Sequence, residues 1–309
     1  MEKITIGIVG LGKIARDQHI PAIRASADFE LAAVAGHNAE VEGLSAYMSV
    51  DEMLTGCPSL DAVAICTPPQ AHYEEALFAL QRRKHVLLEK PPCTTTAQFD
   101  MLVRVALENA CTLFQTWHAR HGVAVEATRL WLMPRHIRNA CIVWKEDVRY
   151  WHPGQSWIWQ AGGFGVLDAG INAISILTRV MAEPFFVETA QLFVPSNCEA
   201  PIAAIVRFRT SSGGQIDAEF DFRHNDRQSC SMRFETEGGT LQLLEHGSAL
   251  SIDGVAMPFE QGAGEYHSVY RRFAELIRQR QSDTDYRPLQ LVADIFLAAR
   301  RTATKAFHE

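Results

Sequence analysis

A glycine-rich turn directly after a short apolar run constrains this chain most, because it places an anion-binding turn at the end of a first strand. The run covers residues 4–9, and Gly10, Gly12 and Ala15 follow it at the spacing G-x-G-x-x-G/A. Gly10 permits a tight turn, Gly12 permits close approach of a pyrophosphate, and Ala15 lets the following helix pack on the strand. The positive N-terminus of that helix would face the anion, so the motif predicts a dinucleotide site.

Length and charge exclude several classes of protein. A chain of 309 residues that is 47% hydrophobic is long enough for two domains. The net charge of -7 argues against a general affinity for nucleic acid or anionic membranes. The chain enters a strand without a leader-like segment, and no apolar run approaches the ~20 residues that span a bilayer, so we expect a cytoplasmic protein.

The cysteines and histidines do not form a metal-binding pattern. The seven cysteines are scattered without a C-x-x-C pair, which is typical of reduced core thiols. His118 and His121 could share a helical face, but no nearby cysteine or carboxylate completes a ligand set. The sequence predicts no metal.

The order of predicted elements changes near residue 120. Residues 1–119 alternate strands and helices, which predicts a Rossmann domain with a doubly wound parallel sheet. Residues 120–309 predict an α+β domain with a large open, mainly antiparallel sheet, because strands and Gly-Gly turns follow one another as in a meander. Two amphipathic helices close the chain at 266–280 and 289–307, and we expect the last to brace the Rossmann domain.

The second and third βα units carry polar residues where their strands end. Ligands bind outside the carboxyl ends of the strands in such sheets. A solvated Glu89–Lys90 ion pair is the alternative interpretation. The predicted cofactor-binding residues are Gly10, Gly12, Lys13, Ile14, Gly36, His37, Cys66, Thr67, Pro68, His72, Glu89 and Lys90.

The end of the second strand leaves the choice between NAD and NADP open. An acidic residue normally binds the adenosine ribose there, but the sequence is Gly36-His37-Asn38. His37 and Asn38 could donate to a 2′-phosphate, and no arginine strengthens that attraction, so both cofactors are expected to bind.

A tryptophan-rich segment suggests a sugar ligand. Trp144, Trp151, Trp157 and Trp159 lie close together, and exposed aromatic faces suit the C–H side of a sugar. Trp157 and Trp159 fit core positions better than ligand positions, so Trp151 is the better ligand candidate. Glu146 and His152 flank it, and His118 follows the last Rossmann strand, so we expect these three side chains to bind substrate hydroxyls.

Asp168 and Asn172 lie four residues apart at the start of a predicted helix and so share one face. Oxidation of an alcohol needs a base for the O–H proton and a positive partner for the developing oxyanion. Asp168 can be the base and Lys90 the positive partner. The alternative for Asp168 is a helix N-cap.

Read together, the glycine turn, the T-P-x-x-x-H segment at 67–72 and the K-H-V-x-x-E-K-P segment at 84–91 resemble the Gfo/Idh/MocA oxidoreductase family over essentially the whole chain. The resemblance implies a Rossmann domain that binds NAD or NADP, a catalytic Lys90, and a cis peptide bond between Lys90 and Pro91. Residues 12–19, 144–148, 151–155 and 168–173 are similar to aldose 1-dehydrogenases that act on D-galactose and L-arabinose. This implies that Asn172 orients the reacting hydroxyl.

Two alternative functions and one expected assembly complete the predictions. A related polyol or inositol dehydrogenase would need the same residues around a differently shaped pocket. A non-catalytic NAD(P)-binding sensor would not need Lys90, Asp168 and Asn172. An exposed face of the large sheet would suit a homodimer.

Overall fold

The computed structural model describes residues 2–37, 39–224, 229–260 and 262–308. These residues form two compact units. The first unit combines Met1–Trp117 with Ala263–Tyr286, and the second combines His118–Gly262 with Arg287–Glu309.

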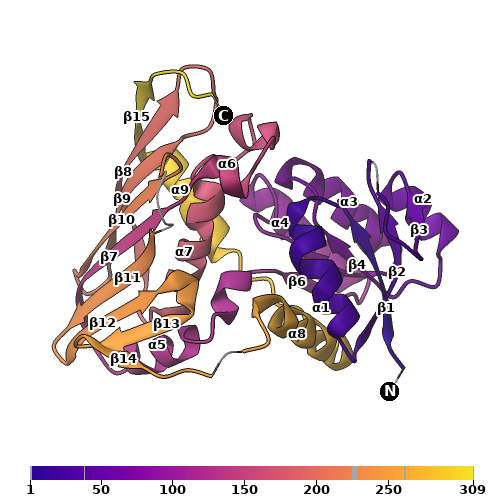
Figure 1. Cartoon of the computed structure of the whole chain (residues 1–309), viewed down its shortest axis with the longest axis horizontal. Helices are drawn as coiled ribbons and strands as arrows, with labels where there is room; N and C mark the ends of the chain where they lie inside the picture. The colour runs from indigo at the N-terminus through magenta and orange to yellow at the C-terminus, as the bar shows by residue number, and fades with distance from the viewer. Residues whose placement is uncertain (1, 38, 225–228, 261, 309) are drawn as a thin grey trace. The chain divides into compact units, whose positions relative to one another are not determined.

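The first unit is built on a six-stranded parallel sheet with the order β3-β2-β1-β4-β5-β6. The order reverses between β1 and β4, which is the position where doubly wound sheets bind ligands. This confirms the predicted Rossmann topology (Figure 1). The strands are β1 Ile4–Val9, β2 Phe29–Ala35, β3 Ser45–Tyr47, β4 Ala62–Ile65, β5 His85–Leu88 and β6 Leu113–Gln115.

Helices cover this sheet, and α2 and α4 begin at side-chain caps. The side chain of Ser49 accepts a hydrogen bond from Glu52 N at the start of α2, and Thr95 accepts one from Gln98 N at the start of α4. The helices are α1 Ile20–Ala25, preceded by a π-helical turn at Ala15–His19, α2 Val50–Gly56, α3 Pro69–Gln81, α4 Thr96–Glu108 and α8 Glu265–Gln279.

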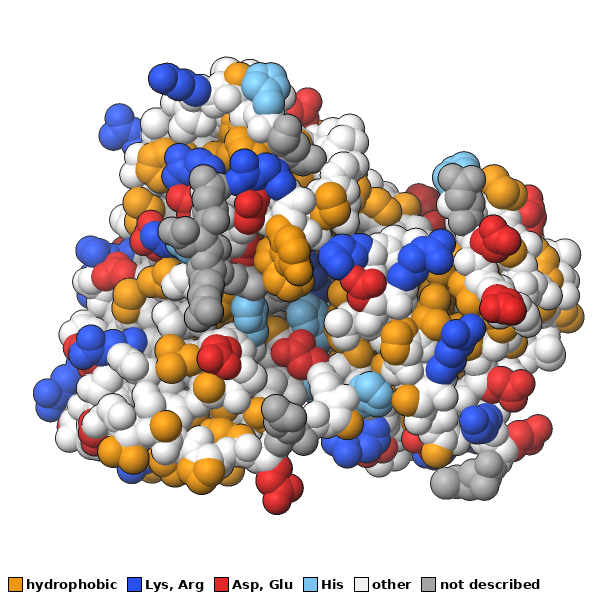
Figure 2. Space-filling view, in the orientation of Figure 1, with side chains coloured by type: hydrophobic (Ala, Val, Ile, Leu, Met, Phe, Trp, Pro, Cys, Tyr) orange, Lys and Arg blue, Asp and Glu red, His pale blue; other side chains and the backbone are white. Residues whose placement is uncertain are grey.

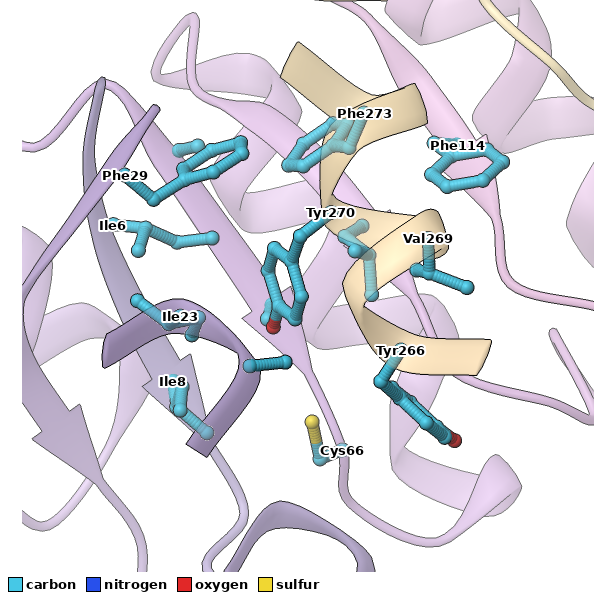
Figure 3. Close-up of a cluster of buried hydrophobic side chains, with 14 of the residues drawn as sticks. Ile6, Ile8, Ile23, Phe29, Cys66, Phe114, Tyr266, Val269, Tyr270 and Phe273 are labelled. Carbon is cyan, nitrogen blue, oxygen red and sulfur yellow. The ribbon is translucent and has the colours of Figure 1, made fainter. Parts of the chain in front are cut away.

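Helix α8 is far away in sequence yet completes the core of the first unit. It buries Tyr266, Val269, Tyr270 and Phe273 among the side chains of β1, β2 and α1 (Figure 3). The ring of Phe273 stacks on that of Phe29 with centroids 5.7 Å apart. Helix α8 therefore packs within the Rossmann unit, whereas residues 287–309 belong to the second unit.

The second unit contains a nine-stranded mixed sheet with the order β14-β13-β12-β11-β7-β10-β9-β8-β15. Most neighbouring strands are antiparallel, as predicted, but β7 is parallel to β10 and lies between β10 and β11. The predicted simple meander is therefore wrong at this point. The strands are β7 Ile137–Lys145, β8 Phe185–Pro195, β9 Ala203–Thr210, β10 Gln215–Asp221, β11 Ser229–Thr236, β12 Gly239–Leu244, β13 Ala249–Ile252, β14 Val255–Met257 and β15 Ala299–Thr304.

Helices cover one face of this sheet and leave the other face open (Figure 1). Gly170 in the helix at Leu167–Val180 lets that helix pack closely on β10, because a Cβ atom at Gly170 would lie 2.9 Å from the ring of Phe220. On the open face, charged side chains pair across strands, as Arg207 does with Asp217. The helical segments are η2 His118–His121, α5 Val125–Leu132, α6 Val148–Trp151, η3 Ser156–Trp159, α7 Leu167–Val180, η4 Glu245–Gly247 and α9 Arg287–Ala298.

The predicted helix over 289–307 is wrong in its second half. Helix α9 ends at Ala298, and Ala299–Thr304 forms β15, which pairs in parallel with β8 at the sheet edge. The two threonines and two arginines of Ala299–Thr304 suit a half-exposed edge strand, and pairing with β8 decides between strand and helix there. Both α9 and β15 belong to the second unit.

On the face shown in Figure 2, basic and acidic side chains are interspersed rather than grouped by sign. Among the described residues, no helix combines the length and apolar character needed to cross a bilayer.

Candidate active site

The glycine turn after β1 has the geometry that a dinucleotide requires. Gly10 adopts φ +88°, and a Cβ atom there would lie 2.6 Å from the backbone nitrogen of Thr67, so only glycine fits. A Cβ atom at Gly12 would meet nothing within 4 Å, so the backbone is open to an incoming pyrophosphate. The residues present therefore fit a bound NAD or NADP at the point where the strand order reverses.

The residues after the turn divide into exposed and packed side chains. Lys13 is partly exposed and pairs with Asp17, while Ile14 packs against the core of the first unit. Arg16 was missed by the sequence analysis. Its Nε donates to Leu11 O at 3.2 Å and its Nη1 to Glu40 O at 3.4 Å, so the guanidinium joins the glycine turn to the segment after β2.

The segment after β2 is where the sequence leaves the choice between NAD and NADP open. Gly36 follows β2 with φ +145°, and His37 is exposed. Asn38 lies outside the described residues. Arg16 therefore places a guanidinium beside the segment after β2, where the sequence analysis counted no arginine.

The end of β4 is tied to the turn after β5 by a buried histidine. His72 Nε2 lies 2.6 Å from Thr67 O, and Nδ1 lies 2.9 Å from Pro91 O. Burial lowers the pKa of His72, which favours the neutral ring. His72 thus supports the backbone around the predicted cofactor residues, and burial likewise raises the pKa of the neighbouring Cys66 thiol.

Glu89, directly after β5, is the centre of a buried hydrogen-bond network. Its Oε1 accepts from the Tyr266 hydroxyl at 2.8 Å and lies 3.1 Å from His19 Nε2, and its Oε2 accepts from Lys90 N at 2.8 Å. The Tyr270 hydroxyl lies 2.7 Å from His19 Nδ1. The alternative interpretation of a solvated Glu89–Lys90 ion pair is therefore wrong, because Glu89 is only 3% exposed. The network joins α8 and the helical turn after Gly12 to the backbone of Lys90.

Lys90 itself is half-buried and follows β5 at the carboxyl edge of the parallel sheet. The Lys90–Pro91 peptide bond is cis, as the family resemblance implied. Thr67, which donates its hydroxyl to Glu75, and Pro68 follow the adjacent strand β4.

In the second unit, the central strand β7 leads into the tryptophan-rich segment. Trp144 is buried and donates its indole N–H to Glu146 Oε1 at 2.6 Å. Asp147 caps the short helix α6 by accepting from Arg149 N at 3.0 Å. Trp151 ends that helix with 39% of its surface exposed, as a sugar-stacking residue requires.

The other tryptophans of the segment are packing residues to different degrees. Trp159 contacts Phe222 and Phe307 with ring centroids 6.2 and 5.4 Å apart. Trp157 is half-buried.

Asp168 lies in the first turn of α7 and is 1% exposed. The N-cap of this helix is Val166, so Asp168 is not the capping residue. Asn172 lies one turn further on the same face and is half-buried. His152 Nε2 lies 3.7 Å from Asp168 Oδ2, and His152 Nδ1 lies 3.2 Å from Gln155 Oε1.

The tautomer of His152 decides what this pair can bind. If Nδ1–H donates to Gln155, the neutral ring presents Nε2 as an acceptor beside the acceptor Asp168 Oδ2. Two acceptors at this separation can share one hydroxyl proton.

His118 begins the turn η2, which Arg120 fastens to α7 through hydrogen bonds to Ser175 O at 2.9 Å and Thr178 Oγ1 at 2.8 Å. The sequence analysis missed His246, whose Nε2 lies 4.0 Å from Glu146 Oε1. No local pattern joins two residues so far apart in the chain.

Comparisons with known proteins agree with these observations. The model of the Gfo/Idh/MocA oxidoreductase family, described as having an NAD-binding Rossmann fold, matches residues 4–116. The chain is 44% identical to a galactose 1-dehydrogenase of Pseudomonas fluorescens over 309 residues, covering 100% of both chains. The crystal structure of a D-galactose-1-dehydrogenase from Rhizobium etli is 47% identical, with a TM-score of 0.94 and coverage of 100% of this chain and 99% of that chain.

A 3-ketoreductase from Actinomadura kijaniata, solved with NADP and TDP-benzene, shares the fold with a TM-score of 0.87 at 21% identity, over 98% of this chain and 100% of that chain. The full-length relatives and the matched Rossmann unit establish that this chain belongs to the Gfo/Idh/MocA family of oxidoreductases and uses NAD or NADP.

Proposed function

We propose that the protein is an aldose 1-dehydrogenase that oxidises D-galactose, and its pentose counterpart L-arabinose, at C1 to the aldonolactone. The observation that carries this proposal is the identity of 44–47% to galactose 1-dehydrogenases over the full chain. The buried Asp168 beside His152 and Asn172 supplies the proton acceptor that such a reaction needs.

The reaction removes one proton from O1 and one hydride from C1. Asp168 Oδ2 accepts the proton, and His152 Nε2 holds the same hydroxyl in line when its Nδ1–H donates to Gln155. A bound NAD or NADP would supply the hydride acceptor. The Lys90 ammonium steadies the negative charge that develops on O1, and Asn172 orients the hydroxyl.

The remaining candidate residues bind the rest of the sugar. The exposed ring of Trp151 offers a face for C–H groups. The Glu146 carboxylate is held by the Trp144 indole and is suited to accept from a sugar hydroxyl, and His118 is the further polar candidate.

We propose that both NAD and NADP serve. No described residue at 36–37 carries a carboxylate that would repel a 2′-phosphate, and the guanidinium of Arg16 hydrogen-bonds within the segment that follows β2. His37 is exposed and available as a donor to the same phosphate.

The seven free thiols suit the cytoplasm, where we propose the protein acts.

We also propose a homodimer through the open sheet face, which exposes Ile205 and Phe186 among paired charges. Light scattering should give a molar mass twice that of one chain, and the Ile205→Glu variant should give the mass of a single chain.

A substrate panel tests the proposed activity. The absorbance of reduced nicotinamide is followed with D-galactose, L-arabinose, D-glucose and myo-inositol, each with NAD and with NADP. The resemblance to galactose dehydrogenases implies a pocket for the axial C4 hydroxyl. D-Glucose would leave that pocket without its hydrogen bond, which costs about 1–3 kcal/mol and predicts roughly ten-fold or greater discrimination. Faster turnover of inositol would support a polyol dehydrogenase, and no turnover of any compound would support a sensor.

A further inference from the structure

Three metal-ligating side chains converge in the second unit. Glu146 follows β7, Cys230 lies in β11, and His246 lies in the turn η4. A carboxylate oxygen, the thiol sulfur and an imidazole nitrogen all lie within 4.8 Å of one another. Glu146 and Cys230 are buried, whereas the His246 side chain is 37% exposed and leaves a route from solvent.

Trp144 is the common neighbour of these three residues. Cys230 is the cross-strand partner of Trp144 in the β11–β7 ladder. The Trp144 indole donates to Glu146 Oε1 at 2.6 Å, and its ring meets the His246 ring at 87° with centroids 4.8 Å apart. A donor of this kind orients a carboxylate as outer-shell partners do in metal sites.

The turn that carries His246 is in an unfavourable backbone conformation. Glu245 and His246 adopt φ +48° and +59°, in the left-handed region that most side chains avoid. Ala124 N donates to Gly247 O at 3.0 Å and holds the turn in place. The imidazole is therefore presented toward Glu146 by a backbone that the surrounding structure constrains.

We propose that Glu146, Cys230 and His246 bind one Zn²⁺ ion. Thiolate, imidazole and carboxylate are the ligand types that Zn²⁺ takes, whereas Mg²⁺ and Ca²⁺ require oxygen ligands. Tetrahedral coordination needs ligand atoms about 3.3–3.7 Å apart, so a contraction of about 1 Å closes the site. The Cys230 thiol releases its proton to solvent, and the fourth position remains for water.

This inference revises the sequence prediction of no metal. That prediction weighed His118 and His121, which are close together in the chain, whereas the ligands proposed here come from three separate segments. If Glu146 also binds sugar, Zn²⁺ inhibits competitively against the sugar. That consequence alone rests on the proposed function, and metal binding is measured without sugar.

Cobalt titration tests the site. The reduced, chelator-treated full-length protein is titrated with Co²⁺, and the thiolate-to-cobalt charge-transfer band is followed and then displaced with Zn²⁺. We expect one ion per chain, loss of the band in Cys230→Ser, and at least ten-fold weaker binding in His246→Gln. Cys141→Ser and His136→Gln, at exposed positions, are matched controls and should bind as the parent does.

Each result decides the proposal. Circular dichroism shows whether each variant is folded, and Cys230→Ala replaces the serine variant if that one is not. A band that persists without Cys230, equal loss in the controls, or no saturable binding to the parent protein would overturn the assignment.

Discussion

Replacing Tyr266 with phenylalanine removes a hydrogen bond to the buried Glu89 carboxylate. The two groups are 2.8 Å apart and buried, and Tyr266 comes from α8 while Glu89 follows β5. A hydrogen bond to a charged group contributes about 1.5–3 kcal/mol, so Tyr266→Phe should lower the free energy of unfolding by that amount. Glu89→Gln should cost about 1–3 kcal/mol, because an amide presents one acceptor oxygen where the carboxylate presents two.

The pair should be coupled. In the double variant, Glu89→Gln has already weakened the hydrogen bond that Tyr266→Phe removes. The loss of free energy of unfolding in the double variant should therefore be about 1–2 kcal/mol smaller than the sum of the two single losses. Urea unfolding followed by fluorescence measures all four proteins. Tyr286→Phe is the control, because Tyr286 is 47% exposed, and it should change stability by less than about 0.5 kcal/mol. Additive costs would refute the network as an energetic unit.

Three further predictions address the cofactor, the chemistry and pH. Gly12→Val should weaken NADH and NADPH binding alike, and His37→Asp should lower the NADP-to-NAD efficiency ratio; an unchanged ratio would place His37 away from the ribose phosphate. Asp168→Asn and Lys90→Met should still bind NADH in a fluorescence titration but lose about 10²–10⁴ in turnover, and near-normal turnover of Asp168→Asn would exclude it as the base. Burial lowers the pKa of His72 below its ordinary 6.5, so the unfolded chain binds more protons and the free energy of unfolding should fall as pH drops below that value. In a His72→Gln variant, the free energy of unfolding, measured by denaturation at successive pH values, should depend less steeply on pH. An equal slope would contradict a lowered pKa for His72.

Local patterns predicted the elements that carry most of the candidate site. The apolar run, the glycine turn and the βα alternation predicted the Rossmann sheet, and helical spacing placed Asp168 and Asn172 on α7. The strands and helices of the Rossmann sheet and the shared face of Asp168 and Asn172 depend on neighbours within a few residues, which sequence periodicity can detect.

The features that the sequence analysis missed depend on distant contacts. β3 and β14 have three residues each, too few for a periodic signal. The place of β7 between β10 and β11 is decided by pairing rather than by its own sequence. The bond between Tyr266 and Glu89 spans 177 positions.

The central claim is that C1 of the sugar gives its hydride to the cofactor, and D-galactose deuterated at C1 tests it directly. The reduced cofactor is isolated after turnover, and its deuterium is measured by mass spectrometry. Oxidation at C1 predicts one deuterium in the reduced nicotinamide, together with a slower reaction if hydride transfer limits the rate. Reduced cofactor without deuterium, with the label retained in the oxidised sugar, would show that another carbon reacts and would contradict the proposed function.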